Sequence, residues 1–167
     1  MATPYKKVIN AFLFRIEEDY KFFHYRNSDD RETERLIRKR AHTFLMEACG
    51  RLMLEGMPTV DFSVDYCVDG SFSFDLTYGE IYLLSSLMYE AYMARDIAKL
   101  KTADVNFTGT EMRVFDPSNA RKTFMEMYAS VKAENDRLLD VYRNTGRLDG
   151  KYITIDFEAY DDSEDNA

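Results

Sequence analysis

Residues 77–93 read TYGEIYLLSSLMYEAYM, and this stretch decides the fold. Thr77 and Glu80 have the spacing of a capping box, in which a hydroxyl and a carboxylate accept hydrogen bonds from each other's backbone amides at a helix start. Between Ile81 and Met93 the one charged residue is Glu90, and apolar side chains point in every direction. A helix that is apolar all round is enclosed by its neighbours. We therefore expect a central helix that begins after Thr77 and reaches about Lys101.

Two helices are predicted before this central one. Thr3 and Pro4 form a typical helix start. The apolar residues that follow at helical spacing are Tyr5, Val8, Ile9, Phe12, Leu13 and Ile16. A second helix is expected from about Asp29 to Leu54, because Gly56 and Pro58 end it. Its buried stripe is predicted to comprise Ile37, Ala41, Phe44, Leu45, Ala48 and Leu52.

The longest helix is expected to start at Asp116-Pro117 and to reach about Asn144, after an irregular segment from Thr102 to Phe115. Its apolar stripe alternates steps of four and three and contains Phe124, Tyr128, Val131, Leu138 and Tyr142. Asn135 interrupts that stripe, and a lone Asn in such a seam can fix the register of packing. We expect the stripe to pack within the domain, with a seam between chains as the alternative.

Residues 60–76 change to a period of two, with large apolar side chains alternating with Asp, Ser and Cys, and predict a β-hairpin. A three-residue loop at 68–70 would pair Tyr66 with Phe72 and place Gly70 in the left-handed conformation. Asp61, Asp65 and Asp75 would lie on the other face. Because carboxylates spread along a strand do not converge on a point, we interpret them as surface acids and predict no metal site.

The end of the chain changes pattern again. Residues 152–157 alternate as a short strand, and an acidic tail follows at 161–167. The predicted fold is therefore mainly α, a bundle of about four helices with an inserted hairpin and a short C-terminal strand. We divide the chain into a helical bundle at 1–150, with its hairpin at 60–76, and a C-terminal strand and tail at 151–167.

Composition restricts the class of protein. The 167 residues are 46% hydrophobic, which suits one folded domain. A net charge of −8 opposes tight binding of nucleic acid, because that binding depends on cations that displace counterions. The N-terminus lacks an apolar signal core and no run is long enough to cross a bilayer, so we expect a cytoplasmic protein. Cys49 and Cys67 are interpreted as buried free thiols, with a disulfide or a metal site as the alternative.

Sequence motifs for catalysis are missing. The chain has no glycine-rich phosphate loop, no His-Glu-x-x-His and no Gly-x-Ser-x-Gly, and it has only two histidines. A helical, magnesium-dependent nucleotide pyrophosphohydrolase would need Glu-x-x-Glu pairs on facing helices, and the sequence contains none. We predict that the protein is not an enzyme and has no cofactor, and we keep the pyrophosphohydrolase as the third hypothesis.

Three sets of residues are candidate interfaces. Phe14 lies opposite the apolar face of its helix and is either a lone exposed aromatic or a subunit contact. Arg31, Arg35 and Arg38, together with His42, line one flank of the second helix. That flank is a solvated face paired with its own acids, a seam to a neighbouring subunit, or a phosphate-binding surface. The apolar face of the last strand consists of Ile153, Ile155 and Phe157, which would extend the local hairpin or dock on another chain.

Several stretches resemble one family of small tailed-bacteriophage proteins. They are residues 74–81 (FDLTYGEI), Leu84, Leu87-Met88 and Tyr92, and then Lys101, Asn106-Phe107, Ala120 and the closing helix to Tyr142. The start at 5–12 and the segment at 41–49 also fit. The family is that of the head–tail connectors, the adaptor or neck rings between portal and tail. The hairpin of this chain is longer than in that family, and the chain continues past Tyr142.

The resemblance implies a structural virion protein that forms a ring of about twelve subunits beneath the portal. The implied partners are other copies of itself, the portal protein and a tail-completion or second neck protein. Duplex DNA would pass through the ring without specific binding, since an acidic wall repels phosphate. The implied location is the neck of the virion, and the host cytoplasm during assembly. The alternative from composition alone is a cytoplasmic helical interaction or regulatory protein that acts as a homodimer.

Overall fold

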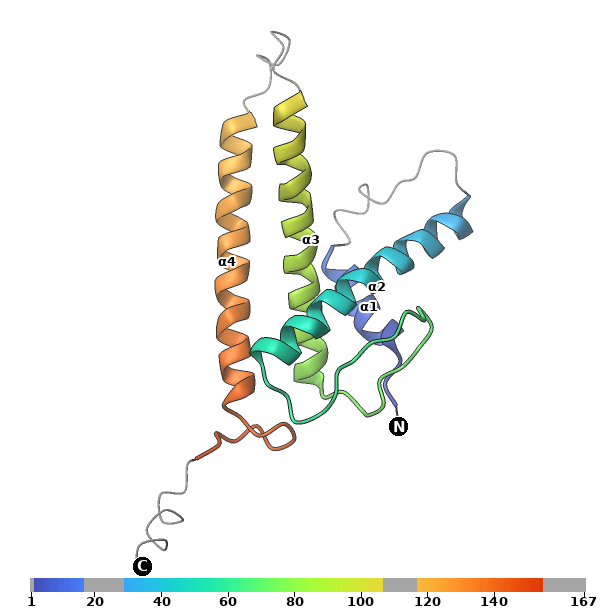
Figure 1. Cartoon of the computed structure of the whole chain (residues 1–167), viewed down its shortest axis with the longest axis vertical. Helices are drawn as coiled ribbons and strands as arrows, with labels where there is room; N and C mark the ends of the chain where they lie inside the picture. Colours follow the sequence, from blue (N-terminus) through green and yellow to red (C-terminus); the bar gives the residue numbers. More distant parts are fainter. Residues whose placement is uncertain (1, 17–28, 107–116, 155–167) are drawn as a thin grey trace, which may run out of the picture.

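The computed structural model describes residues 2–16, 29–106 and 117–154, which contain four α-helices (Figure 1). Helix α1 spans Tyr5–Arg15, α2 spans Asp30–Glu55, α3 spans Tyr78–Asn106 and α4 spans Pro117–Arg143. α3 and α4 run side by side, and α1 and most of α2 pack on the other side of α3 (Figure 1). The predicted mainly helical class is confirmed.

Helix α3 is central, as its apolar surface predicts. It packs against each of the other three helices. The capping box forms, because the Thr77 amide donates to the Glu80 carboxylate at 2.7 Å and the Glu80 amide donates to the Thr77 hydroxyl at 3.2 Å. The predicted end was too early, since α3 continues through Asn106. The remaining part of the predicted irregular segment, from 107, lies outside the described residues.

The apolar faces predicted for α1 and α2 are buried, except that Leu13 is only partly buried. The core includes Val8, Ile9 and Phe12 from α1, and Phe12 packs near Phe44 of α2 and Tyr92 of α3 with ring centroids 5.7 and 6.2 Å away. Asp29 caps α2 by accepting a hydrogen bond from the Glu32 amide. Burial of each such large side chain contributes roughly 1.5–3 kcal/mol, which is enough to orient three short amphipathic faces around one core.

Helix α4 also packs as predicted, with one difference in length. Its stripe faces the core and additionally includes buried Leu139. With 27 residues it is shorter than α3, which has 29, so the prediction that it is the longest helix was wrong.

The predicted β-hairpin does not form. Residues 60–76 contain no strand, and Tyr66 is 89% exposed whereas its predicted partner Phe72 is buried. The Asp61 carboxylate accepts a hydrogen bond from the Ser63 amide at 2.8 Å, and the Asp65 carboxylate accepts one from the Cys67 amide at 3.0 Å. These local bonds turn the chain and use amides that a ladder would need.

Part of this segment pairs instead with the N-terminus of the chain. The Thr3 amide donates to the Phe74 carbonyl at 3.1 Å, and the Phe72 amide donates to the Thr3 carbonyl at 2.9 Å. The Thr3 hydroxyl accepts from the Leu76 amide at 2.9 Å, so it does not cap α1. The result is a short extended contact with a single bridge, between Pro4 and Ser71.

Gly70 is required for close approach and not for a left-handed turn. Positive φ among the described glycines occurs at Gly150, so the conformation predicted for Gly70 was wrong. A Cβ atom on Gly70 would lie 2.6 Å from the ring of Tyr5 and 3.1 Å from the Cys67 carbonyl oxygen. The Gly70 carbonyl accepts from the Tyr5 amide at 3.0 Å. The missing side chain therefore lets this loop lie directly against α1.

The predicted C-terminal strand is likewise a loop as far as the structure describes it. The Gly146 amide donates to the Lys151 carbonyl at 2.7 Å, and the Ile153 amide donates to the Asn144 carbonyl at 2.8 Å. These bonds fold residues 144–153 back on the end of α4, with one bridge between Thr145 and Tyr152. Ile155 and Phe157 lie outside the described residues.

Candidate assembly surface

Arg51 is the centre of an ion-pair network that joins three helices. Its guanidinium contacts Glu90 on α3 and Asp136 on α4, and it lies 2.9 Å from Glu55 one turn further along α2. Glu90 is 6% exposed. A buried carboxylate requires a counterion, because its loss of hydration is otherwise uncompensated. The network therefore fixes α2, α3 and α4 relative to one another.

Asn135 completes this network from α4. Its side chain is buried, and its amide nitrogen donates to the Ser86 carbonyl at 3.2 Å and to the Glu90 carboxylate at 2.7 Å. The polar interruption of the α4 stripe thus faces α3 of the same chain. The preferred prediction, packing within the domain, is confirmed.

A second buried carboxylate fastens the C-terminal loop to the start of α3. Glu80 is 1% exposed, and Arg147 Nε donates to it at 2.6 Å. The Tyr142 hydroxyl also donates to Glu80, at 3.0 Å. Burial and then the Glu80 charge raise the pKa of Tyr142 well above its ordinary value. The Arg147 guanidinium stacks 4.7 Å from the ring centre of Phe74, which ties the loop to the 56–77 segment as well.

These anchors leave apolar side chains exposed at the end where α2 and α4 meet. Leu54 is 79% exposed and Met57 is 69% exposed, and both line a groove of about 260 Å³ with Leu139 and Arg143 of α4. Met57 has φ +45°, a left-handed conformation that costs a non-glycine residue about 1 kcal/mol. Exposed apolar area held in place by a rigid backbone is typical of contact surfaces.

Four of the predicted interface residues have side chains at the surface. Phe14 is 77% exposed on α1, and Arg31 and Arg35 are exposed on α2. Arg38 is partly buried and pairs with Glu34 at 2.8 Å. Ile153 is exposed in the loop that folds back on the end of α4. The structure therefore does not bring these five described residues together into one patch, and Ile155 and Phe157 lie outside the described residues.

His42 does not belong to the flank on which the sequence placed it. It is buried, with its ring centre 5.8 Å from that of Tyr5. Burial lowers the pKa of His42 below its ordinary value. His42 follows Arg38 by four residues, which is about 40° more than one helical turn, and this extra rotation together with the close approach of α1 turns the side chain into the core. Cys67 also departs from its prediction, because its free thiol is exposed, while Cys49 is free and buried as expected.

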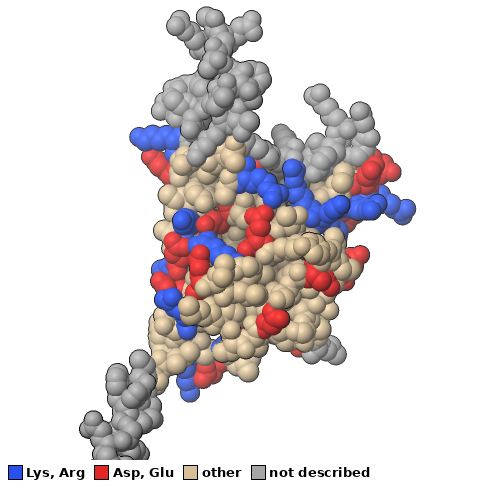
Figure 2. Space-filling view, in the orientation of Figure 1, with Lys and Arg blue, Asp and Glu red and all other residues tan. Residues whose placement is uncertain are grey.

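Charge is distributed unevenly over the surface. Figure 2 shows Lys and Arg side chains gathered over the first half of α2, and a largely uncharged area lower down. Six of the 30 acidic residues lie in residues 155–167, which contain no Lys or Arg. The first 154 residues therefore carry 24 acidic and 22 basic side chains, a formal charge of −2. The acidity of the chain belongs mostly to its tail and not to the bundle.

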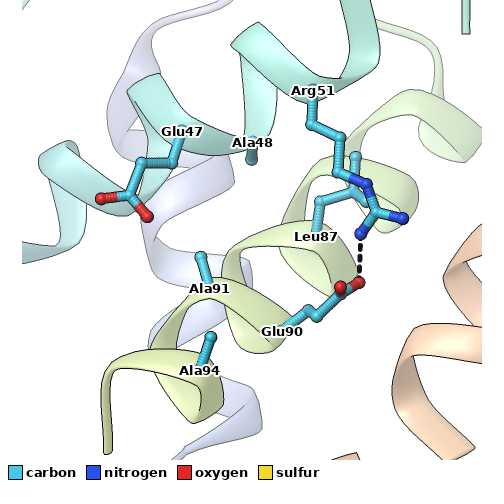
Figure 3. Close-up of a pocket in the computed structure, with 7 residues that line it drawn as sticks. All are labelled: Glu47, Ala48, Arg51, Leu87, Glu90, Ala91 and Ala94. Atoms are coloured by element: carbon cyan, nitrogen blue, oxygen red, sulfur yellow. Dashed lines mark hydrogen bonds and ion pairs between the residues drawn. The ribbon is translucent and has the colours of Figure 1, made fainter. Parts of the chain in front are cut away.

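A second groove lies between α2 and α3 and is lined by alanines (Figure 3). Ala48 faces Ala91 and Ala94, and the ion pair of Arg51 with Glu90 closes one end. Its volume of about 170 Å³ is below the range of roughly 300–1,000 Å³ typical of small-molecule sites. We interpret it as a packing gap left by small residues.

The two glutamates of α3 are engaged in ion pairs. Arg147 pairs with Glu80, and Arg51 pairs with Glu90. Within the described ranges, no three His, Cys, Asp or Glu side chains gather where they could hold a metal ion. No helix in the described part of the chain combines the length and the hydropathy that crossing a bilayer requires.

The sequence contained a signal for the first network that was not used to find it. Glu90 was recognised as the one charge in an apolar stretch, and Asn135 as the one polar residue in an apolar stripe. Buried polar groups are almost always hydrogen-bonded, so two such residues on neighbouring helices are candidate partners. Arg51 could not be chosen in this way, because α2 contains five arginines and nothing in the sequence separates this one from the rest.

Comparison of the chain with protein-family models, with curated proteins and with solved structures finds no match.

Proposed function

We propose that this protein is a subunit of a head–tail connector ring of a tailed phage, located in the virion neck and assembled in the host cytoplasm. It joins other copies of itself, the portal protein and a tail-completion or second neck protein. The proposal starts from the sequence resemblance and requires a rigid subunit with more than one contact surface. The two buried ion-pair networks supply the rigidity, because they join α2, α3, α4 and the C-terminal loop.

The observation that carries the proposal is the placement of exposed apolar residues on different sides of the molecule. Phe14 lies on α1, while Leu54 and Met57 lie beside α4, and α1 and α4 are on opposite sides of α3 (Figure 1). A ring is built from heterologous contacts, in which two unlike faces of each subunit meet. A homodimer with two-fold symmetry needs only one such face.

The charge distribution changes what is expected of the ring's channel. The sequence suggested an acidic wall, but the first 154 residues have a formal charge of only −2. Passage of DNA would then depend on which face lines the channel, and the first half of α2 is unsuited to that position because its cations would bind phosphate. We expect that part of α2 to face a neighbouring subunit.

Electron microscopy and native mass spectrometry of the purified full-length protein test the proposal. They should be done on the protein alone and on its mixture with the portal protein of the same genome. We expect closed rings of about twelve subunits, at the latest when the portal is present. Substituting Phe14 by Ser and, separately, Leu54 and Met57 by Ser should each reduce ring formation while leaving the circular dichroism spectrum helical.

Two other results would contradict the proposal, and a third would contradict only its choice of contact surfaces. A dimer that neither closes into rings nor binds the portal would favour the regulatory homodimer. Nucleotide hydrolysis that depends on added magnesium would favour the pyrophosphohydrolase. Rings that form equally well with Ser at Phe14 and at Leu54 and Met57 would show that these side chains are not the contact surfaces.

A further inference from the structure

The first half of α2 presents a stripe of cations that the fold leaves uncovered. Arg31, Arg35 and Lys39 recur every four residues, so they lie along one side of the helix, and all three are exposed. Arg38 borders them but pairs with Glu34. Acidic residues of α2 are confined to its first five positions and to the part after Met46. We call Arg31, Arg35 and Lys39 the α2 stripe.

The chemical complement of this stripe is present in the same chain. Residues 155–167 contain six carboxylates, four of them between 161 and 165, and no basic side chain. They also contain Ile155, Phe157 and Tyr160, which could add apolar contacts. The carboxylates of a peptide pair favourably with arginine and lysine, and arginine binds them with two parallel hydrogen bonds.

Geometry disfavours contact between stripe and tail within one subunit. The described chain ends beyond the C-terminal end of α4, on the side of the molecule away from the first half of α2 (Figure 1). Along α2 alone, Arg35 is 20 residues from Glu55, a distance of about 30 Å. Asp161 is seven residues past Thr154, which reaches only about 24 Å when fully extended. Even Lys39, the nearest of the three cations at 16 residues or about 24 Å from Glu55, would meet Asp161 only if the intervening chain were almost fully extended.

We infer that the acidic tail of one subunit binds the α2 stripe of the next copy. The described chain ends on the side of the subunit away from the α2 stripe, so such a contact is head-to-tail and repeats from copy to copy. This inference rests on the proposed function, because it supplies one of the unlike contacts that a ring requires. It also accounts for a cation stripe that would otherwise bind DNA in a conduit.

Charge reversal in the full-length protein tests the contact. One variant carries Arg35→Glu and Lys39→Glu, a second carries Asp161→Lys and Asp162→Lys, and a third combines all four substitutions. Self-association is measured by sedimentation at about 50 mM salt, with a Kd of the order of 10 μM expected for the native protein. Each single reversal should weaken association at least about tenfold, and the combined variant should regain it.

A matched control separates local pairing from net charge. Lys122→Glu with Lys132→Glu changes the charge by the same amount at two exposed positions of α4 and should leave association unchanged. Mixing the two single-reversal variants should also restore association. The acidic tail of the first variant can then pair with the basic stripe of the second, and the lysines in the tail of the second can pair with the glutamates in the stripe of the first. The inference is overturned if the native protein stays monomeric at about 100 μM, if the control behaves like the stripe variant, or if the combined variant does not recover.

The failure of this inference can be told from the failure of the proposed function. If portal-bound rings form with every charge-reversal variant, the connector function stands and the stripe is not the contact between subunits. If association depends on these charges but gives open chains that do not bind the portal, the contact between tail and stripe stands and the connector function is wrong. If reversal of the stripe abolishes binding of duplex DNA but not self-association, the stripe is a nucleic-acid surface and the inference is wrong.

Discussion

At the scale of single residues, Met57 and His42 each have an unfavourable local conformation or environment in the described structure. Met57 is exposed and has a left-handed backbone. His42 is buried, and within the described residues its Nε2 atom has no hydrogen-bond partner. Packing of the helices imposes both features. Met57 lies where the chain turns away from the end of α2 beside α4, and His42 is covered because α1 approaches α2 closely. Strain of this kind persists where the surrounding structure over-determines it.

Met57→Gly should stabilise the protein by about 0.5–1 kcal/mol, because glycine adopts a positive φ without a Cβ clash. The side chain is largely exposed, so little packing is lost. Urea unfolding measures the change. Leu54→Gly is the control inside α2 and should destabilise, since glycine costs about 1 kcal/mol in a helix. A destabilised Met57→Gly would mean that the Met57 side chain packs against something in solution.

His42 should make stability fall in weak acid. Its pKa in the folded protein is below the ordinary 6.5, with burial as the main cause, so below about pH 6.5 the unfolded chain takes up a proton that the folded chain does not. Stability is therefore present above that pH and is lost as the pH falls toward the folded pKa. His42→Leu should have a flatter urea-midpoint profile between about pH 7.5 and 5. Identical profiles for the two proteins would assign the acid sensitivity to other groups.

At the scale of secondary structure, polar contacts decide how the helices and loops meet. Arg51 joins three helices, Arg147 fastens the C-terminal loop to α3, and Thr3 fastens the N-terminus to the 70–76 segment. Apolar faces determine which sides of helices are buried, but many angles and registers bury similar areas. Directional bonds to buried carboxylates select among them, because a misplaced partner leaves a charge without compensation.

Arg51→Met should destabilise the protein by about 3–5 kcal/mol, because it leaves Glu90 buried without its counterion. Adding Glu90→Gln should recover much of the loss, since a glutamine carbonyl can still accept the Asn135 hydrogen bond. Free energies of unfolding from urea titrations measure both effects. Arg137→Met, which removes an exposed pair with Glu134, is the control and should change little. A double variant no more stable than Arg51→Met would contradict the network.

Gly70→Ala should cost about 1–3 kcal/mol, because its Cβ would overlap the buried ring of Tyr5 and a backbone oxygen. Gly50→Ala provides an internal comparison. Gly50 lies inside α2 with no atom within 4 Å of the added Cβ, so this change should stabilise by about 0.5–1 kcal/mol. Thermal unfolding distinguishes the two. Equal effects would imply that the loop of residues 67–70 does not rest on α1 in solution.

At the scale of the whole molecule, charge separates the bundle from its tail. The first 154 residues are nearly neutral in sum, with cations over the first half of α2, and the last 13 carry six carboxylates. A single value of net charge hides this division. We therefore expect any repulsion of DNA by the full-length protein to come mainly from the tail carboxylates, which would compete with phosphate for the same cations.

The full-length protein should bind duplex DNA no more tightly than about micromolar at physiological salt. Changing the six tail carboxylates to their amides should tighten that binding, because the α2 stripe is no longer opposed or occupied. Fluorescence anisotropy with a labelled duplex at two salt concentrations measures it. Tight binding by the native protein would contradict passage of DNA without specific contact, and unchanged binding by the amide variant would show that the tail does not screen the stripe.

The sequence by itself determined the four helices, most of their buried faces and the central position of α3. A periodicity of 3.6 residues and local caps such as Thr77 with Glu80 depend only on neighbours along the chain. They can therefore be recognised from the sequence without knowledge of the tertiary structure. The networks of Arg51 and Arg147 could not be predicted, because they join residues more than 35 positions apart whose partners depend on how the helices cross.

Only the tertiary structure decided what the alternating segments become. Residues 60–76 and 152–157 have the period of strands, but a strand needs a partner whose backbone lies alongside. In this fold the N-terminus occupies the edge at residues 70–76, aspartates bond the amides near 61–67, and the end of α4 holds residues 144–153 in a loop. A period of two reports alternating exposure, and the packed helices determine whether a backbone partner is present.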